Sequence, residues 1–204
     1  MQIDPKLQTK PDNYKLLTNL VIPRPIAWIT SLSNAGTVNL APFSFFNAVG
    51  ADPIYIVVSI GINEQGKPKD TAENILSTGE FVVNLVTEAL FDAMNLSAAD
   101  FPPEESELEA ARLDSAPSVL VKPPRVAAAH ASLECTLYSS QKLGENTLII
   151  GEVVMFHVAD HLIGPKMHVE NFAPIGRLGS PSAYCRTLDR FNVPRISYAQ
   201  VKNR

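Results

Sequence analysis

Short apolar runs separated by turn residues dominate the first half of the chain, and they predict strands more often than helices. Ala27–Leu32 and Asn39–Phe46 flank turn residues within Ser33–Val38, which predicts a β-hairpin. Ile54–Ile60 is apolar without alternation, as is typical of a strand buried on both faces. Phe81–Val86 predicts the next strand.

Helical patterns interrupt these strands in two places. Asp70 and Glu73 stand where the N-cap and N3 residues of a capping box would be, so a helix is predicted to begin near Asp70. Gly79 predicts its C-terminal stop. Between Glu88 and Ala99, apolar residues recur at helical spacing and predict a second short helix.

The second half of the chain predicts a larger hairpin, an excursion and an arm. Ala127–Leu143 and Thr147–Val158 are β-rich runs around a glycine-containing turn. Residues 100–124 carry paired prolines around an acidic run and predict an excursion or lid. The loop-rich stretch from Pro174 predicts a C-terminal arm. We expect one domain over residues 1–204, mainly β with attached helices and built as a small closed barrel.

Composition narrows the classes of protein to consider. The 204 residues are 46% hydrophobic and carry a formal net charge of -4, which does not favour binding to nucleic acid. Residues 1–15 are polar and contain two prolines, so they lack the pattern of a signal peptide. No apolar run approaches the roughly 18 residues of a membrane span. We expect a soluble cytoplasmic protein with no membrane or nucleic-acid partner.

Metal ligation is not indicated by the cysteines and histidines. Cys135 and Cys185 lie far apart, outside any paired-ligand spacing, and we expect both to be reduced thiols. His157 and His161 have the i,i+4 spacing of metal ligands on a helix, but they fall on a predicted strand and the turn after it. We therefore expect no metal site.

Common cofactor and nucleophile motifs do not occur in the sequence. It contains neither the GxGxxG fingerprint of a Rossmann fold nor a GxSxG nucleophile elbow. Gly61–Lys67 resembles the opening of a P-loop, but the next residue is Pro68, which has neither a hydroxyl group nor a backbone N–H.

Two stretches carry polar groups suited to a planar ligand with a phosphate tail. Lys69, Asp70 and Thr71 open the predicted helix, where free N–H groups and the helix dipole would stabilise a phosphate. An ordinary capped helix with solvated lysines would explain the same residues. The first hairpin adds hydroxyl, amide and apolar groups that suit a heterocycle and a polyol, although they are also normal hairpin residues. These hairpin candidates are Thr30, Ser31, Leu32, Ser33, Asn39, Ala41, Pro42, Phe43 and Ser44.

In combination, four ordered motifs resemble the flavin reductase-like, FMN-binding split-barrel family. They are PRPIAWITS at 23–31, NLAPFSFFN at 39–47, KDT at 69–71 followed by Asn74-Ile75, and EFVVN at 80–84. The resemblance spans most of residues 20–185 and implies a six-stranded Greek-key split barrel. It also implies that the hairpin candidates line the flavin and that Lys69 and Thr71 meet its phosphate. The family pattern often has a glycine where Ser180 stands, so Arg177 is as consistent with a structural ion pair as with a cofactor contact.

The same resemblance implies a homodimeric NAD(P)H-dependent oxidoreductase with FMN near the subunit interface. Hydride would pass from NAD(P)H to FMN, and electrons would then go to an acceptor or a partner oxygenase. Since the flavin carries the chemistry, no catalytic acid or base is expected. NAD(P)H would bind transiently against the flavin, under the 100–124 excursion. Two alternatives stay open: an FMN protein acting on another substrate, and a flavin-binding module without turnover.

Overall fold

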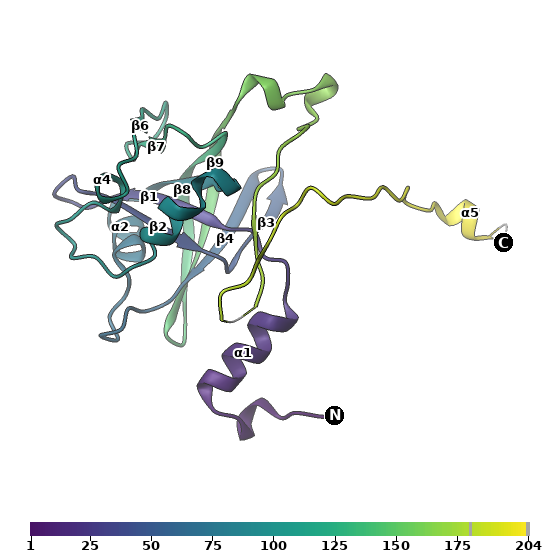
Figure 1. Ribbon diagram of the computed structural model, residues 1–204, viewed down its shortest axis with the longest axis horizontal. Coiled ribbons are helices and arrows are strands. Elements are labelled where there is room, and N and C mark those ends of the chain that lie inside the picture. Colours follow the sequence, from purple (N-terminus) through teal and green to yellow (C-terminus); the bar gives the residue numbers. More distant parts are fainter. Residues whose placement is uncertain (180, 203–204) are drawn as a thin grey trace.

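The computed structural model describes residues 1–179 and 181–202, which form one curled antiparallel sheet with attached helices (Figure 1). The strand order is β2-β1-β5-β8-β9-β4-β3. These strands are β1 (Ala27–Leu32), β2 (Val38–Phe43), β3 (Phe46–Ala51), β4 (Ile54–Ile60), β5 (Glu80–Leu85), β8 (Ala131–Leu143) and β9 (Asn146–Val158). Because only Ser44 and Phe45 join the outermost strands β2 and β3, the sheet curls until its two edges approach each other.

The bend at Ser44 and Phe45 divides a segment that the sequence predicted as one strand, Asn39–Phe46. Up to Phe43 the chain pairs with β1, whereas from Phe46 it pairs with β4. The backbone N–H of Ser59 already donates to the Phe45 carbonyl at 2.8 Å, so the change of partner is complete within two residues. The bend adds a seventh strand to the six that the resemblance implied.

Five helices and two small hairpins complete the part of the chain that the structure describes. The helices are α1 (Lys10–Leu20), α2 (Asp70–Thr78), α3 (Phe91–Leu96), α4 (Glu107–Ala110) and α5 (Tyr198–Lys202). The hairpins pair β6 (Ser115–Ala116) with β7 (Arg125–Val126), and β10 (Gly176–Arg177) with β11 (Tyr184–Cys185). Within the described ranges, no helix combines the length and apolar character that crossing a membrane would require.

Strand β1 is buried on both faces because different helices cover its two sides. Ile29 packs inside the barrel with Ile75 of α2. Trp28 points to the opposite face and packs with Met94 of α3. Its indole N–H donates to the Ser97 hydroxyl at 2.8 Å, which satisfies a buried donor. This packing places the start of α2 and the end of α3 beside β2.

The start of α2 differs from the predicted capping box. Lys69, not Asp70, is the N-cap residue, and its side chain makes no capping hydrogen bond. Asp70 is instead the first helical residue, because extended backbone continues through Lys69. Gly79 ends the helix with a left-handed backbone (φ 75°), as predicted. The first turn of α2 is therefore not capped by the side chain at its N-cap position.

Helix α1 was not predicted, and it projects from the barrel below the sheet (Figure 1). Its N-cap Thr9 accepts the backbone N–H of Asp12 at 3.3 Å, and a proline stands in its first turn. Most of its apolar side chains, including Leu17 and Leu20, are exposed. Thr18 is the one residue of this helix that is buried, so α1 adds little to the core.

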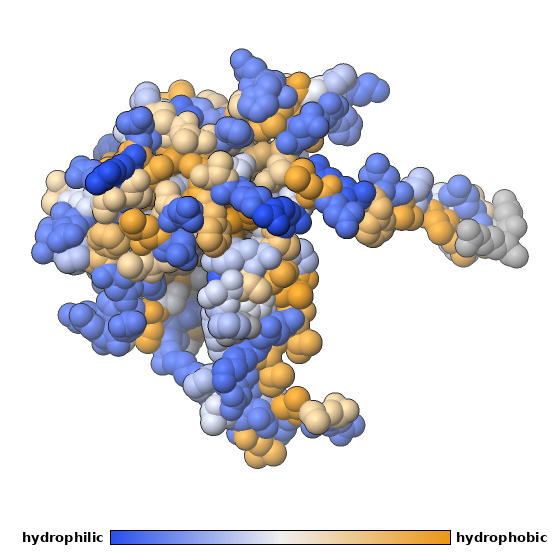
Figure 2. All heavy atoms as spheres, in the orientation of Figure 1, coloured by the Kyte–Doolittle hydropathy of each residue, from blue (hydrophilic) through white to orange (hydrophobic). Residues whose placement is uncertain are grey.

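The chain after β11 extends away from the barrel and ends in α5 (Figure 1). Apolar side chains line this arm (Figure 2), among them Phe191 with 88% and Val193 with 75% of their surface exposed. Ser180, the position that departs from the family pattern, lies outside the described residues.

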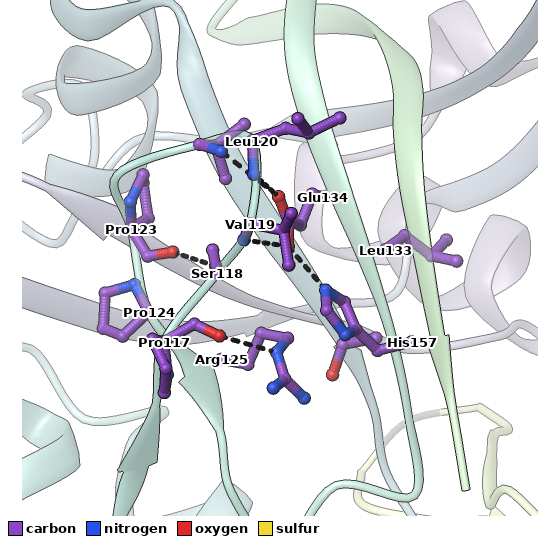
Figure 3. Close-up of polar contacts among 12 residues, drawn as sticks. Pro117, Ser118, Val119, Leu120, Pro123, Pro124, Arg125, Leu133, Glu134 and His157 are labelled. Carbon is purple, nitrogen blue, oxygen red and sulfur yellow. Dashed lines mark hydrogen bonds and ion pairs between the residues drawn. The ribbon is translucent and has the colours of Figure 1, made fainter. Parts of the chain in front are cut away.

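Buried polar side chains of the sheet fasten the later part of the 100–124 excursion (Figure 3). The fully buried carboxylate of Glu134 accepts the backbone N–H groups of Val119, Leu120 and Val121 at 2.7, 2.6 and 3.1 Å, and it also contacts His157. Burial opposes ionisation of Glu134, but these hydrogen bonds prevail and lower its pKa below the usual range.

Candidate functional site

Two adjoining cavities lie along β2, between the start of α2 and the β10–β11 hairpin, and together we call them the cleft. It consists of a cavity of about 60 Å³ and a second of about 210 Å³, which share Pro42, Phe43 and Ala98 in their walls. We call the smaller part the α2 end and the larger part the hairpin end. A concave site between elements is where small ligands usually bind.

The α2 end combines a lysine, a hydroxyl group and the first turn of a helix. Asn39 of β2 donates its side-chain N–H to the Thr71 hydroxyl at 2.8 Å, which fixes the orientation of that hydroxyl. Lys69 lines the same cavity and supplies a positive charge. The full set of lining residues is Asn39, Ala41, Pro42, Phe43, Asn63, Lys69, Asp70, Thr71, Ser97, Ala98, Ala99, Asp100, Phe101 and Glu107.

Three carboxyl groups share the α2 end with Lys69. The Lys69 ammonium lies 2.9 Å from the Asp100 carboxylate, and this contact lowers the pKa of Asp100. Burial raises the pKa of Asp70. Burial also raises the pKa of Glu107, although its carboxylate accepts the Leu40 N–H at 2.8 Å. The charge on Lys69 is therefore already compensated by the protein.

The hairpin end is larger and mostly apolar. Its walls come from β2, α1, α3 and the β10–β11 hairpin, and no carboxylate lines it. The Arg177 guanidinium lies 4.5 Å from the ring centroid of Tyr184, as in a cation–π contact. The lining residues are Tyr14, Ile26, Pro42, Phe43, Ser44, Met94, Ala98, Arg177 and Tyr184. This end can accept a flat molecule against side chains of β2 and β11.

The structure brings eight of the twelve candidate residues to the cleft. They are Asn39, Ala41, Pro42, Phe43, Ser44, Lys69, Asp70 and Thr71. The other four lie elsewhere: the buried Thr30 donates its hydroxyl to the Pro124 carbonyl, and the Ser31 hydroxyl accepts the Asn74 amide. Leu32 is half-buried at the end of β1, and Ser33 lines a neighbouring hollow that shares Asn39 and Asp70 with the α2 end.

Several cleft residues were not identified from the sequence. The segment Ser97–Phe101 and Glu107 come from the end of α3 and from the excursion, while Tyr14 comes from the unpredicted helix α1. Tyr184 lies in a loop-rich stretch. The acidic composition of the excursion was the one sequence signal for carboxyl groups in the cleft. The positions of these residues could not be predicted, because long-range packing decides which loop residues reach β2.

His157 and His161 lie on β9 and the short turn after it, as predicted. No group of three or more potential metal ligands occurs within residues 1–179 and 181–202. Cys135 and Cys185 are both free, and burial raises the pKa of the Cys135 thiol well above its ordinary range.

The fold and cleft define a flavin reductase-like split barrel, and comparison with known proteins establishes the family. The family model "Flavin reductase like domain" matches residues 19–175, so the chain belongs to this family of flavin-related oxidoreductases. The recognition made from four sequence motifs is thereby confirmed.

Solved structures agree with this assignment. The chain is 39% identical to nitrilotriacetate monooxygenase component B from Bacillus cereus, with a TM-score of 0.88 over 95% of this chain and 98% of that one. It is 36% identical to 2-nitrobenzoate 2-nitroreductase from Pseudomonas fluorescens, with a TM-score of 0.88 over 97% and 98% of the chains. A flavin reductase with a split-barrel domain, described as putative, from Shewanella frigidimarina matches with a TM-score of 0.83 at 20% identity, over 96% and 100%. This last likeness supports the fold alone, and the predicted split barrel is confirmed.

Proposed function

We propose that the cleft binds FMN and that the protein transfers a hydride from NAD(P)H to it. The flavin phosphate would lie at the α2 end, and the ring would lie along Ala41–Ser44 toward the hairpin end. When bound, FMN supplies the redox chemistry by accepting the hydride. The side chains of the cleft bind and orient the two partners and exclude water.

The observation that carries this proposal is that the two cavities adjoin along β2 and share wall residues. A phosphate site and an apolar surface for a ring would be unrelated features if Pro42 and Phe43 did not line both cavities. The donor set at the α2 end suits a phosphate, because Lys69 provides charge and Thr71 a hydroxyl. The first turn of α2 adds N–H groups and the positive end of the helix dipole, unopposed by a capping side chain at Lys69.

The hydride donor would occupy the remaining part of the hairpin end. We propose NAD(P)H because the chain belongs to a flavin reductase-like family. The excursion contributes Asp100, Phe101 and Glu107 to the α2 end, so its early part would cover the phosphate more directly than the nicotinamide. In the same proposal electrons pass to an acceptor or to a partner oxygenase, as suggested by the similarity to a monooxygenase component B.

A second function is favoured by a separate comparison. The similarity to 2-nitrobenzoate 2-nitroreductase extends over 97% of this chain, which favours an FMN protein that reduces its own organic substrate. A flavin-binding module without turnover is the third possibility. Oxidation of NAD(P)H that depends on added free FMN would single out the reductase, whereas NAD(P)H oxidation that needs only bound FMN and an organic acceptor would favour the second function.

We also propose that the protein is a cytoplasmic homodimer, since its proposed electron donor is supplied in the cytoplasm. The exposed apolar side chains of the C-terminal arm, including Phe191 and Val193, support a dimer because a second copy could bury them.

The phosphate position is tested by titrating FMN into a Lys69→Met, Thr71→Val variant and following flavin fluorescence. Loss of two phosphate contacts of about 1.5–3 kcal/mol each should weaken FMN binding by roughly 3–6 kcal/mol. Lys67→Met is the matched control, because Lys67 is exposed and does not line the cleft. Riboflavin, which lacks the phosphate, should bind all three proteins alike.

Two results would contradict the proposal. If the unaltered protein takes up no FMN, the cleft is not a flavin site. If the double variant binds FMN as tightly as the Lys67 control does, the phosphate lies elsewhere.

A further inference from the structure

Two arginines at the hairpin end of the cleft lack a carboxylate partner. Arg24 is only 7% exposed and donates to the carbonyls of Thr18, Val21 and Leu178 at 2.7, 2.6 and 2.8 Å. Its Nε approaches the Ser44 hydroxyl at 3.5 Å, and the Thr18 and Val21 carbonyls belong to the C-terminal end of α1, whose dipole compensates part of the Arg24 charge. A buried cation is normally paired with an anion.

Arg177 adds a second positive charge beside the first. Its guanidinium makes one long hydrogen bond, to the Pro181 carbonyl at 3.3 Å, and stacks on Tyr184. Within the described residues neither Arg24 nor Arg177 forms an ion pair. Burial lowers the pKa of Arg24, and the nearby charge of Arg177 acts in the same direction.

The carboxyl groups that line the neighbouring cavities do not pair with these two arginines. Glu88 and Asp92 line a separate hollow on the other side of Tyr184, and Glu88 is bonded to Arg186. The other carboxyl groups of the cleft, including Asp100 and Glu107, lie at the α2 end. Among the described residues, the hairpin end therefore offers an anion a guanidinium that no carboxylate pairs, whereas Lys69 at the α2 end already has a carboxylate partner.

The contacts of Arg177 and the apolar lining favour a planar anion at the hairpin end. Arg177 is held against the face of Tyr184, whose ring meets Phe91 edge-on at 4.9 Å between centroids. A guanidinium fixed in this way can offer two parallel N–H groups to one carboxylate. The remaining wall is apolar, with Phe43 and Met94 available to the body of the ligand.

We infer that the hairpin end binds an aromatic carboxylate, with its carboxylate group paired to Arg177 and its ring lying against the apolar wall. Arg24 lies behind Ser44 and adds positive charge beside the site without lining the cavity. The inference rests on the proposed function in one respect, since the aromatic ring would lie next to the flavin. It names the class of substrate that would bind the cleft in addition to NAD(P)H.

The test compares benzoate with benzamide, its neutral analogue of nearly the same shape. Each is titrated into the FMN-loaded protein, following the flavin absorption spectrum, and into the cofactor-free protein by calorimetry. The unaltered protein should bind benzoate about tenfold more tightly than benzamide. Arg177→Gln should weaken benzoate binding about 10- to 100-fold, the value of a lost charge-assisted contact, and leave benzamide unchanged.

Arg186→Gln is the matched control, because Arg186 is a nearby arginine already paired with Glu88 and outside the cleft cavities. It should bind benzoate as the unaltered protein does. Arg177→Lys keeps the positive charge but loses the planar fork, so it should bind benzoate with intermediate affinity. If Arg177→Gln does not fold, the benzoate affinity of Arg177→Lys is measured in its place.

Equal binding of benzoate and benzamide, or benzoate binding that survives Arg177→Gln, would overturn the inference. The inference would also be overturned if Arg177→Gln lost affinity for NADPH but kept its affinity for benzoate. FMN affinity is measured first on every protein: if FMN does not bind, the proposed function fails, while calorimetry on the cofactor-free protein still reports whether Arg177 holds a carboxylate.

Discussion

Replacing Asp100 by asparagine should strengthen FMN binding, although most substitutions in a binding cleft weaken it. Asp100 occupies the position beside Lys69 that a phosphate oxygen would take, with its carboxylate 2.9 Å from the ammonium. Carboxylate and phosphate therefore compete for the same donor. Asparagine keeps the shape and can still accept the Glu64 N–H, which Asp100 now accepts at 3.4 Å.

The size of the effect follows from two contributions. The Lys69–Asp100 pair is about one-third exposed on both sides, so breaking it costs only about 0.2–1 kcal/mol after solvent screening. A carboxylate left near the phosphate adds a repulsion of about 1 kcal/mol in a water-like medium. Together they predict FMN binding about 7- to 30-fold tighter in Asp100→Asn, since about 1.4 kcal/mol corresponds to a factor of ten.

The assay is a flavin fluorescence titration at low and high salt, accompanied by the rate of FMN release. Asp100→Asn should release FMN more slowly, and its advantage should shrink as salt screens the charges. Riboflavin should bind both proteins equally, because it carries no phosphate. Glu104→Gln removes one exposed charge from the same excursion and should have little effect. If Asp100→Asn binds FMN more weakly, Asp100 orients Lys69 instead of competing with the cofactor, and the reasoning is refuted.

Two further predictions concern stability and assembly. The pKa of Glu134 lies below its ordinary 4.5 in the folded protein, so its ionised form stabilises the fold above pH 4.5, and this contribution is lost as the pH falls through the lowered pKa. Glu134→Gln should therefore cost about 2–4 kcal/mol at pH 7 in urea unfolding, and a cost that does not shrink as the pH is lowered through that pKa would contradict this. Ending the chain after Thr187 removes the exposed apolar side chains of the arm and should convert the proposed dimer to a monomer in light scattering, whereas ending it after Ser197 keeps Phe191 and Val193 and should preserve the dimer. A truncated protein that stays dimeric would place the interface elsewhere.

The local patterns predicted most of the sheet because they depend on residues close in sequence. The hairpin of β1 and β2, the buried strand β4 and the long β8–β9 hairpin all follow from apolar runs and turn residues. The bend at Ser44 could not be predicted in this way, because the apolar run continues through it. The strand ends there because the residues from Phe46 pair with β4. Helix α1 was missed because its first half lies in a polar, proline-containing segment that was not read as helical.

The same distinction between local patterns and long-range packing applies to the candidate site. Lys69, Thr71 and the β2 residues could be selected because the polar groups of one short segment already suggest a phosphate or a ring. Thr30 and Ser31 looked equally suitable, but their hydroxyl groups satisfy buried partners, Pro124 and Asn74, that are distant in sequence. Asp100, Glu107 and Arg177 reach the cleft through tertiary packing, which residue spacing does not encode.

The excursion is anchored unevenly, and this limits how the cleft can open. Its later part is fixed by a buried carboxylate and three backbone N–H groups, whereas Asp100 at its start is held mainly by one solvent-screened contact with Lys69. Amide protons near residue 100 should therefore exchange with solvent long before those of residues 119–121. The segment near Asp100 can therefore move while residues 119–121 stay attached to the sheet. Such a movement would open the proposed phosphate site without unfolding the barrel.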